Sequence, residues 1–345
     1  MKFGVIGSGS WATALVKILS DNGQEINWWV RNKEQIAHIQ KRRYNPQYLS
    51  SARLDISLLT VSDDINEVVR NSDVILLVVP SAFIQEVLEG VNKEELLNKK
   101  ILSAIKGIVP GADILLNDFL AIHFNIPIEN YFALLGPCHA EEVASEKLSY
   151  LTFSGVDITM AEKISLCFKT SYINTVINSD IIGVQYAAVL KNIYALGAGI
   201  AHGLEYGDNF LSVYIANSAD EMAGFLRKAG VEHIVVGEHE EDSSSTHKKS
   251  PNYAASVYLG DLLVTCYSPY SRNRTFGNMI GKGYTVQSAQ LEMNMVAEGY
   301  YASKCIDHIN QKTGANIPIA KTVYKILWER MQPAEGFKQI EETLI

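Results

Sequence analysis

The chain opens with Lys2-Phe3-Gly4-Val5-Ile6-Gly7-Ser8-Gly9-Ser10-Trp11-Ala12, and this stretch decides the fold. A strand-like run is followed by G-x-G-x-x-A where a helix should begin. In that context Gly7 permits a tight turn, Gly9 leaves room for a diphosphate, and small Ala12 lets helix and strand pack closely. The N–H groups at the helix N-terminus then face the phosphates. A glycine-rich turn without a ligand is the alternative, and the position directly after the first strand favours dinucleotide binding.

The rest of the chain divides into two halves of different character. In the first half, short β-branched runs at residues 26–30, 74–79, 101–105 and 131–135 alternate with amphipathic stretches, which predicts a parallel sheet. Beyond about Asn178, apolar residues recur at helical spacing, as in residues 186–204, 211–229 and 289–309. We therefore predict an α/β protein with a Rossmann-type dinucleotide-binding domain over residues 1–178 and an all-α substrate-binding and catalytic domain over residues 179–345.

Composition excludes several classes of protein. The 345 residues are 47% hydrophobic and 20% charged, which suits two folded cores, and the net charge of -8 argues against binding to nucleic acid or an anionic membrane. The longest apolar run, residues 74–80, is far shorter than the roughly 20 residues that span a bilayer. Four scattered cysteines read as reduced thiols, and no export signal is recognised. We expect a cytoplasmic protein without a membrane span or a nucleic-acid partner.

The residue after the second predicted strand bears on the choice of cofactor. An NAD-selective enzyme commonly places an acidic residue there for the ribose hydroxyls, whereas this chain has Arg31. A cation can instead face the additional phosphate of NADP. A solvated arginine is the alternative, and nearby Glu34 weakens the case. We expect NADP or NAD as the cofactor, with NADPH favoured.

The first helical segment of the second half carries a lysine on its apolar face. Ala187, Leu190 and Tyr194 form a stripe at spacings of three and four, and Lys191 lies on it. A charged side chain in this position is unfavourable unless it reaches water or meets a partner. Snorkelling to solvent and a functional role both account for this pattern.

A later segment combines cations with hydrogen-bond donors. The sequence GDLLVTC at residues 260–266 is followed by Ser271-Arg272-Asn273-Arg274. Guanidinium groups donate paired hydrogen bonds to phosphate oxygens, and Ser and Asn add further contacts. The cluster therefore indicates a phosphate site, with a basic helix start on a solvated face as the alternative.

One polar segment interrupts the helical half. Residues 237–250, GEHEEDSSSTHKKS, have no apolar face and predict an exposed loop. His239 and His247 lie within it, but no further ligands join them at a regular spacing. We therefore expect no metal site.

Together these motifs resemble the NAD(P)-dependent glycerol-3-phosphate dehydrogenase family, bacterial type, over nearly the whole chain. The matching signatures are residues 7–15, Lys106-Gly107, residues 136–144, Leu190-Lys191-Asn192, Gly207-Asp208-Asn209, Gly260-Asp261-Leu262, Ser271-Arg272-Asn273-Arg274 and Glu298-Gly299. The resemblance implies reversible reduction of dihydroxyacetone phosphate to sn-glycerol 3-phosphate, which supplies glycerophospholipid synthesis. The apolar helices could support a homodimer, an assembly common in that family.

The resemblance also implies roles for individual residues. Lys191 would be the catalytic acid/base, with Lys106 and Asp261 completing the catalytic set. The cofactor would be held by Gly7, Gly9, Ser10, Trp11, Ala12, Arg31, Lys106, Ala140, Arg272 and Glu298. The substrate would be surrounded by Lys106, Gly136, Cys138, Asp261, Ser271, Arg272 and Asn273.

Some features depart from the family pattern and leave other interpretations open. Cys138 stands where Ser is usual, and a thiol is a weaker hydrogen-bond partner than a hydroxyl. Gln185 and Ala297 replace the usual Glu and Val. A nucleophilic couple of Cys138 and His139 is disfavoured because adjacent side chains seldom point the right way. A two-domain hydroxyacid dehydrogenase and an inactive cofactor-binding regulator remain the alternatives.

Overall fold

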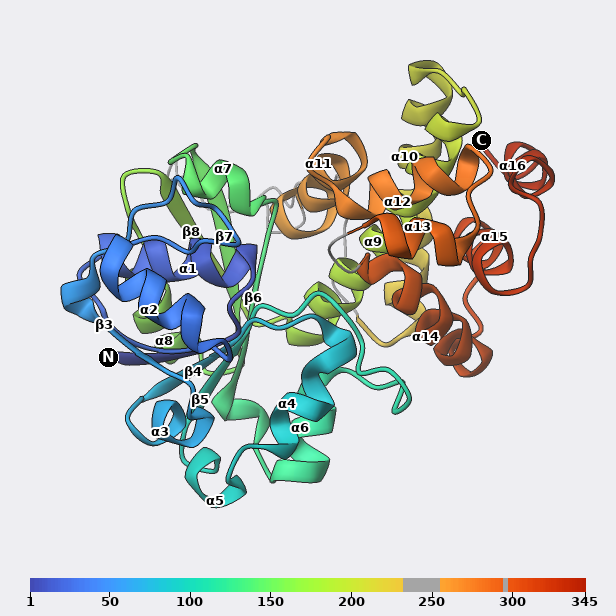
Figure 1. The fold of residues 1–345 in the computed structure, drawn as a ribbon. Coiled ribbons are helices and arrows are strands. Elements are labelled where there is room, and N and C mark those ends of the chain that lie inside the picture. The colour runs from blue at the N-terminus through green and yellow to red at the C-terminus, as the bar shows by residue number, and fades with distance from the viewer. Residues whose placement is uncertain (232–254, 294–296) are drawn as a thin grey trace, which may run out of the picture. The chain divides into compact units, whose positions relative to one another are not determined.

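The computed structural model describes residues 1–231, 255–293 and 297–345 (Figure 1). The chain separates into two units, Met1–Ile181 and Ile182–Ile345, and each is described by itself. The polar segment 237–250, with His239 and His247, lies outside the described residues.

The first unit is built on an eight-stranded sheet with the order β3-β2-β1-β4-β5-β6-β7-β8. Its strands are β1 (Lys2–Ile6), β2 (Glu25–Trp29), β3 (Leu59–Ser62), β4 (Val74–Leu77), β5 (Lys100–Ser103), β6 (Tyr131–Leu135), β7 (Ser149–Ser154) and β8 (Ile173–Asn178). All neighbouring strands are parallel except β6 and β7. The order reverses between β1 and β4, and sheets of this kind bind ligands beyond the carboxyl ends of the strands at such a reversal.

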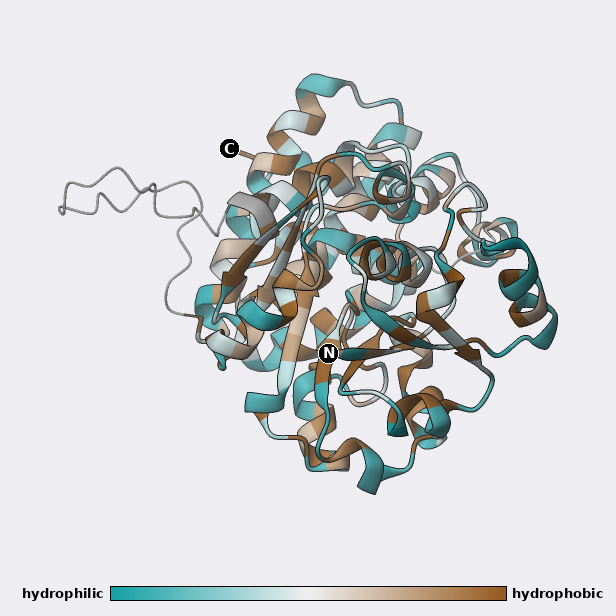
Figure 2. Ribbon diagram, turned by 90° about the vertical axis from the view of Figure 1, so that its left-hand side faces the viewer, coloured by the Kyte–Doolittle hydropathy of each residue, from teal (hydrophilic) through white to brown (hydrophobic). Residues whose placement is uncertain are grey.

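Alternating side chains give this sheet two buried faces. Phe3 and Val5 of β1 share one core with Leu76 of β4, whereas Ile6 is buried outside that core. The reversal of strand order places the connecting helices on both sides of the sheet (Figure 1). Figure 2 shows hydrophobic residues running along the strands. The predicted Rossmann-type α/β unit is confirmed.

The helices of the first unit connect these strands. They are α1 (Ser10–Asp21), α2 (Lys33–Arg42), α3 (Ile65–Arg70), α4 (Ile84–Glu89), α5 (Lys93–Leu96), α6 (Leu116–Phe124), α7 (Ala140–Ala144) and α8 (Ile158–Leu166). Three short 3₁₀ turns lie between them, at Ile56–Leu58, Ser81–Phe83 and Ile128–Asn130.

Three of the eight strands were not predicted. β3 and β8 form the two edges of the sheet, and their residues are mostly half-buried or exposed, so their apolar pattern is weak. β7 is buried but contains polar residues such as Thr152 and Ser154, both fully buried. The predicted ranges 74–79 and 101–105 also run two residues past β4 and β5, because the apolar sequence continues into the loops.

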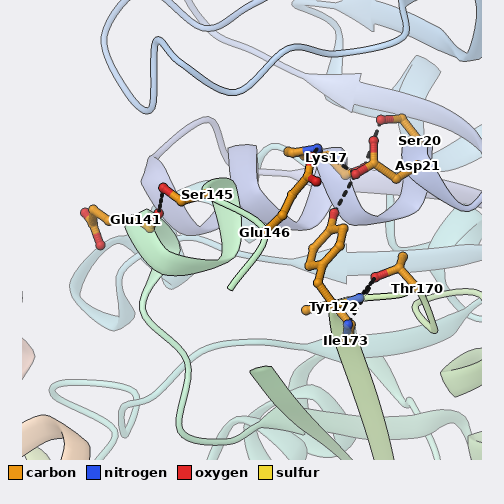
Figure 3. Close-up of polar contacts among 9 residues, drawn as sticks. All are labelled: Lys17, Ser20, Asp21, Glu141, Ser145, Glu146, Thr170, Tyr172 and Ile173. Atoms are coloured by element: carbon orange, nitrogen blue, oxygen red, sulfur yellow. Dashed lines mark hydrogen bonds and ion pairs between the residues drawn. The ribbon is translucent and has the colours of Figure 1, made fainter. Parts of the chain in front are cut away.

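A partly buried ion cluster holds α1 in place (Figure 3). Lys17 donates through Nζ to Asp21 Oδ2 at 2.6 Å and to Glu146 Oε1 at 3.0 Å. Tyr172, just before β8, donates its hydroxyl to the same Asp21 oxygen at 2.5 Å. Burial lowers the pKa of Lys17, but the hydrogen bonds and charges of the two carboxylates outweigh it and raise the pKa overall. The cluster therefore ties α1 to the α7 segment and to β8.

Every regular element of the second unit is helical within residues 182–231, 255–293 and 297–345. The helices are α9 (Ile181–Gly203), α10 (Asp208–Lys228), α11 (Asp261–Tyr267), α12 (Arg272–Gly281), α13 (Val286–Glu292), α14 (Glu298–Thr313), α15 (Pro318–Trp328) and α16 (Pro333–Glu341). A short π-helix, Ala255–Gly260, leads into α11. The segment 289–309, which has one helical pattern, is divided between α13 and α14, since Met293 adopts an extended backbone.

The long helix α9 is the core of this unit. Among the described residues it is the one helix long and apolar enough to cross a bilayer by length and composition. However, 89% of its most apolar window is buried inside the protein, which is typical of a core helix. Gln185, Lys191 and Asn192 interrupt its apolar residues, so α9 contains no long uninterrupted apolar run.

Glycines allow α12 to lie directly against α9. A Cβ added to Gly277 would lie 1.9 Å from the Leu196 carbonyl oxygen, and one added to Gly199 would lie 2.1 Å from the Arg274 carbonyl oxygen. Only residues without a side chain permit backbones to approach this closely. The contact therefore places the first turn of α12 beside α9.

A buried carboxylate joins α10 to the start of α15. Glu221 accepts hydrogen bonds from the backbone N–H groups of Ile319 and Ala320, at 2.7 and 2.9 Å, and from the Tyr194 hydroxyl at 3.1 Å. A carboxylate at a helix N-terminus satisfies N–H groups that have no partner within the helix. Burial nevertheless raises the pKa of Glu221 to about 7, although the three hydrogen bonds oppose the shift.

Candidate active site

The two glycines of the predicted dinucleotide turn are required for different physical reasons. Gly7 has a φ of +129°, and a Cβ there would lie 2.2 Å from the Val78 carbonyl oxygen. It therefore serves the turn and the close approach to the segment after β4. A Cβ on Gly9 would meet nothing within 4 Å, so this position borders open space that a ligand can enter. Ala12 is fully buried.

The other predicted cofactor residues at this edge differ in exposure. Ser10 is buried and Trp11 is half-buried in the first turn of α1, and the Trp11 Nε1 is buried without a hydrogen-bond partner among the described residues. Arg31 is exposed just beyond β2. Ile6 and Trp29 are register partners at the ends of β1 and β2. Arg31 and the glycine turn therefore both follow the carboxyl ends of two neighbouring strands, β2 and β1.

Three more predicted residues come together after β5 and β6. Lys106 Nζ donates to the Gly136 carbonyl oxygen at 3.2 Å, and the Cys138 thiol donates to the Tyr150 carbonyl oxygen at 3.1 Å. Gly136 has a φ of +138°, and a Cβ there would lie 2.5 Å from that Tyr150 oxygen. Ala140 begins α7 and is buried. Lys106 meets Gly136 because β5 and β6 are parallel neighbours whose carboxyl ends lie side by side. Gly136 and Cys138 meet Tyr150 because β7 runs antiparallel to β6, so β7 begins beside the end of β6.

In the second unit, Lys191 lies in a buried ion pair. Its side chain is 3% exposed, and Nζ contacts Oδ1 of Asp261, whose side chain is 1% exposed. Nζ also donates to Thr265 Oγ1 at 3.1 Å. Asp261 and Thr265 lie one turn apart on α11 and therefore share a face. The alternative in which Lys191 snorkels to solvent is wrong.

A second cation, Arg274, lies near the Lys191–Asp261 pair and acts on the thiol of Cys266. Cys266, next to Thr265, is fully buried, and burial raises the pKa of its thiol to about 12 against the opposing charges of Lys191 and Arg274. Arg274 is half-buried, and its Nε is shielded from solvent without a hydrogen-bond partner among the described residues. Two cations and one carboxylate thus surround this thiol.

The predicted phosphate cluster forms the start of α12. Ser271 caps this helix by accepting a hydrogen bond from the Arg274 N–H at 3.3 Å, while Arg272 is exposed. Asn273 is buried, donates to Asn192 Oδ1 at 3.0 Å and accepts from the Gly299 N–H at 2.9 Å. It therefore joins α9, α12 and α14. Only part of this helix start is solvated.

The structure thus groups the predicted residues within each unit. Glu298 is the first residue of α14 and precedes Gly299, whose N–H bonds to Asn273, so Glu298 also lies close to Asn273. Lys106 and Lys191 belong to different units, and their proximity stays a prediction. Thr265 was not predicted, although its spacing of four from Asp261 was a usable signal.

A glycine turn of this kind, at the reversal point of a parallel sheet, is typical of dinucleotide-binding proteins. The family models are more specific. The model for the N-terminus of NAD-dependent glycerol-3-phosphate dehydrogenase matches residues 2–161, and that for its C-terminus matches residues 180–338. The chain belongs to the NAD-dependent glycerol-3-phosphate dehydrogenase family.

Similar proteins support this assignment across the whole chain. A glycerol-3-phosphate dehydrogenase of the NAD(P)+ type from Lacticaseibacillus paracasei is 32% identical over 95% of this chain and 91% of its own length. One from Staphylococcus carnosus is 30% identical over 98% and 96%. The crystal structure of glycerol-3-phosphate dehydrogenase from Coxiella burnetii has a TM-score of 0.85 at 24% identity, covering 99% of this chain and 98% of that one, which shows a shared fold. The predicted fold class, family and NAD(P)-dependent oxidoreductase class are confirmed.

Proposed function

We propose that this protein reduces dihydroxyacetone phosphate to sn-glycerol 3-phosphate with NADPH or NADH. The observation that carries the proposal is the buried Lys191–Asp261 pair on α9 and α11. It lies in the unit whose α12 begins with the cluster of Ser, Arg and Asn, and in a chain of this family. The open space beside Gly9 fits a bound diphosphate.

Lys191 would supply the proton in this reaction. The bound dinucleotide provides the hydride for the carbonyl carbon, and the carbonyl oxygen then needs a proton. Asp261 and Thr265 hold Lys191 Nζ through the ion pair and a 3.1 Å hydrogen bond, so its direction is fixed before substrate binds. Positioned general acids contribute about 10² to 10⁴ in rate. A nearby ammonium also stabilises the negative charge that develops on the oxygen.

The substrate phosphate would be recognised at the start of α12. Arg272 is exposed there and can present a guanidinium fork to phosphate oxygens. Asn273 is engaged by Asn192 and Gly299, so its main effect would be to hold this turn in place. Gly136, Cys138 and Lys106 would also contact the substrate, and Ala140 and Glu298 would contact the cofactor.

The reaction is tested by following NADPH or NADH absorbance with dihydroxyacetone phosphate, in wild type and in Lys191→Ala. Rapid oxidation by wild type and near-total loss in the variant would support both the substrate and the proton donor. Tight binding of dinucleotide without oxidation would identify a cofactor-binding regulator. Oxidation of NADPH or NADH with a 2-oxo acid, but not with dihydroxyacetone phosphate, would identify a hydroxyacid dehydrogenase.

Arg31 would favour NADPH over NADH. Its exposed guanidinium lies at the same sheet edge as the glycine turn, where it could pair with the 2′-phosphate of NADP. We expect Arg31→Asp to lower the kcat/KM ratio of NADPH to NADH at least tenfold, because a carboxylate repels that phosphate. Arg70→Asp makes the same change of charge on α3 and should leave the ratio unaltered. An unaltered ratio in Arg31→Asp would refute this assignment.

The setting of the enzyme follows from the same proposal. It would act in the cytoplasm and supply the glycerol phosphate backbone of membrane lipids. All four cysteines lie in the described ranges and none forms a disulfide, which suits a reducing compartment. A homodimer stays a prediction, and sedimentation equilibrium at several protein concentrations would test it.

A further inference from the structure

The three consecutive carbonyl groups of the glycine turn each accept a hydrogen bond from a side chain. The three donors come from β2, from the loop after α2 and from α1 itself. Trp28 Nε1 bonds to the Gly7 oxygen at 2.7 Å, Asn45 Nδ2 to the Ser8 oxygen at 3.1 Å, and Thr13 Oγ1 to the Gly9 oxygen at 2.9 Å. All three donor residues are fully buried. The carbonyl groups therefore point into the protein.

The direction of these carbonyl groups also fixes the direction of the N–H groups. In a planar trans peptide the C=O and N–H bonds point in opposite directions. Carbonyl groups turned toward buried donors thus leave the N–H groups of Ser8, Gly9 and Ser10 pointing away from those donors. Successive N–H groups at a helix N-terminus are the donors that bind a diphosphate.

Asn45 is the centre of this arrangement. Besides its bond to Ser8, its Nδ2 donates to Thr13 Oγ1 at 2.8 Å, and its Oδ1 accepts from Gln35 Nε2 at 2.9 Å and from the Gln47 N–H at 3.1 Å. Both amide hydrogens and both oxygen lone pairs are then in use. Gln35 lies in the first turn of α2, soon after Arg31. The network thus connects the glycine turn with the segment that would face the 2′-phosphate.

Trp28 supports the turn from the adjacent strand. The indole has a single N–H donor, and a buried one needs a partner. Here the partner is the Gly7 carbonyl oxygen. Its neighbour Trp29 bonds instead to the Asp63 carbonyl oxygen at 3.1 Å, at the edge of the sheet.

We propose that Trp28, Asn45 and Thr13 are positioning residues that preset the N–H groups of the turn for the cofactor diphosphate. They act through the turn, because their side chains are buried. The inference rests on the proposed function only for the identity of the dinucleotide. It predicts that losing one of these donors weakens cofactor binding and leaves the proton transfer step unaffected.

Trp28→Phe is the first test, and Trp29→Phe is its matched control. Both remove an indole N–H from β2, but only the first reaches the turn. We expect Trp28→Phe to raise the Kd for NADPH and NADH about three- to tenfold, as the loss of one hydrogen bond would, with kcat near the wild-type value. Trp29→Phe should bind as wild type does. Equal weakening in the two variants, or none in Trp28→Phe, would overturn the proposal.

Thr13 allows a second test that changes shape very little. Thr13→Val removes the hydroxyl that bonds to Gly9, whereas Thr13→Ser keeps it. We expect the Val variant to lose affinity for NADPH about three- to tenfold but not for adenosine 2′-monophosphate, which has no diphosphate, and the Ser variant to recover the affinity. Equal losses for both ligands would indicate general destabilisation and overturn the proposal.

The Kd values for NADPH and NADH are measured by dinucleotide fluorescence, and that for adenosine 2′-monophosphate by its displacement of NADPH, so none of them needs turnover. If the protein fails to reduce dihydroxyacetone phosphate but shows the expected pattern of Kd values, the proposed reaction is wrong and the role of these three residues stands. If the reaction occurs but the Kd values do not change, the proposed reaction stands and the role of these three residues is wrong.

Discussion

Replacing Lys191 with Met should affect stability and activity separately, and both effects can be worked out from the structure. Met keeps the length of the side chain but removes the ammonium from Asp261, whose side chain is 1% exposed. Breaking a buried ion pair by removing one partner costs about 3–5 kcal/mol. Since a folded protein is stable by about 5–15 kcal/mol, Lys191→Met should remain folded but unfold at clearly lower urea concentration.

The double variant Lys191→Met/Asp261→Asn separates the two roles. Asn has nearly the shape of Asp without its charge, so the double variant should recover most of the lost free energy of unfolding. It should not recover activity, because the proposed proton donor is still absent. We expect kcat to be about 10² to 10⁴ lower in both variants.

Urea unfolding and the oxidation of NADPH by dihydroxyacetone phosphate measure these two effects. A double variant no more stable than Lys191→Met would contradict the view that an uncompensated buried carboxylate causes the instability. Activity of Lys191→Met close to that of wild type would show that another group donates the proton.

Four further substitutions have outcomes that follow from packing and burial. Gly9→Ala should leave the urea midpoint unchanged but weaken NADPH binding at least tenfold, whereas Gly7→Ala, with a Cβ 2.2 Å from a carbonyl oxygen, should unfold more easily. Gly277→Ala should cost about 1–3 kcal/mol or more in urea unfolding, because it forces α12 away from α9. The folded pKa of Glu221 is about 7 against an ordinary 4.5, so its contribution to stability is complete below pH 4.5 and is lost as the pH rises through 7. The free energy of unfolding of wild type relative to Glu221→Gln should therefore fall between about pH 4.5 and about pH 7, and a rise would contradict this sign.

The strands and helices that the sequence predicts correctly are those with the strongest apolar patterns. β4, with its four buried residues, and the apolar stripe of α9 could be recognised without knowledge of their neighbours. β3 and β8 could not, because a strand at the edge of a sheet buries fewer side chains and carries a weaker pattern. The break between α13 and α14 was missed because the apolar spacing continues across it.

The same distinction applies to the candidate site. Gly7 and Gly9 could be assigned from local sequence, since the physical reason for each lies within one turn of chain. Asn45 could not, because its partners Ser8, Thr13 and Gln35 meet only after the loop following α2 has folded over the turn. A residue of this kind is detected from three-dimensional contacts and leaves no motif.

Burial also decides which group near Lys191 can take part in chemistry. Cys266 lies close to two cations, a setting that often activates a cysteine as a nucleophile. Here burial is the larger effect and raises the pKa of the thiol to about 12, so it stays protonated at neutral pH. Lys191 instead has Asp261 and Thr265 as fixed partners for its ammonium. This contrast supports the proposal that Lys191, and not Cys266, donates the proton.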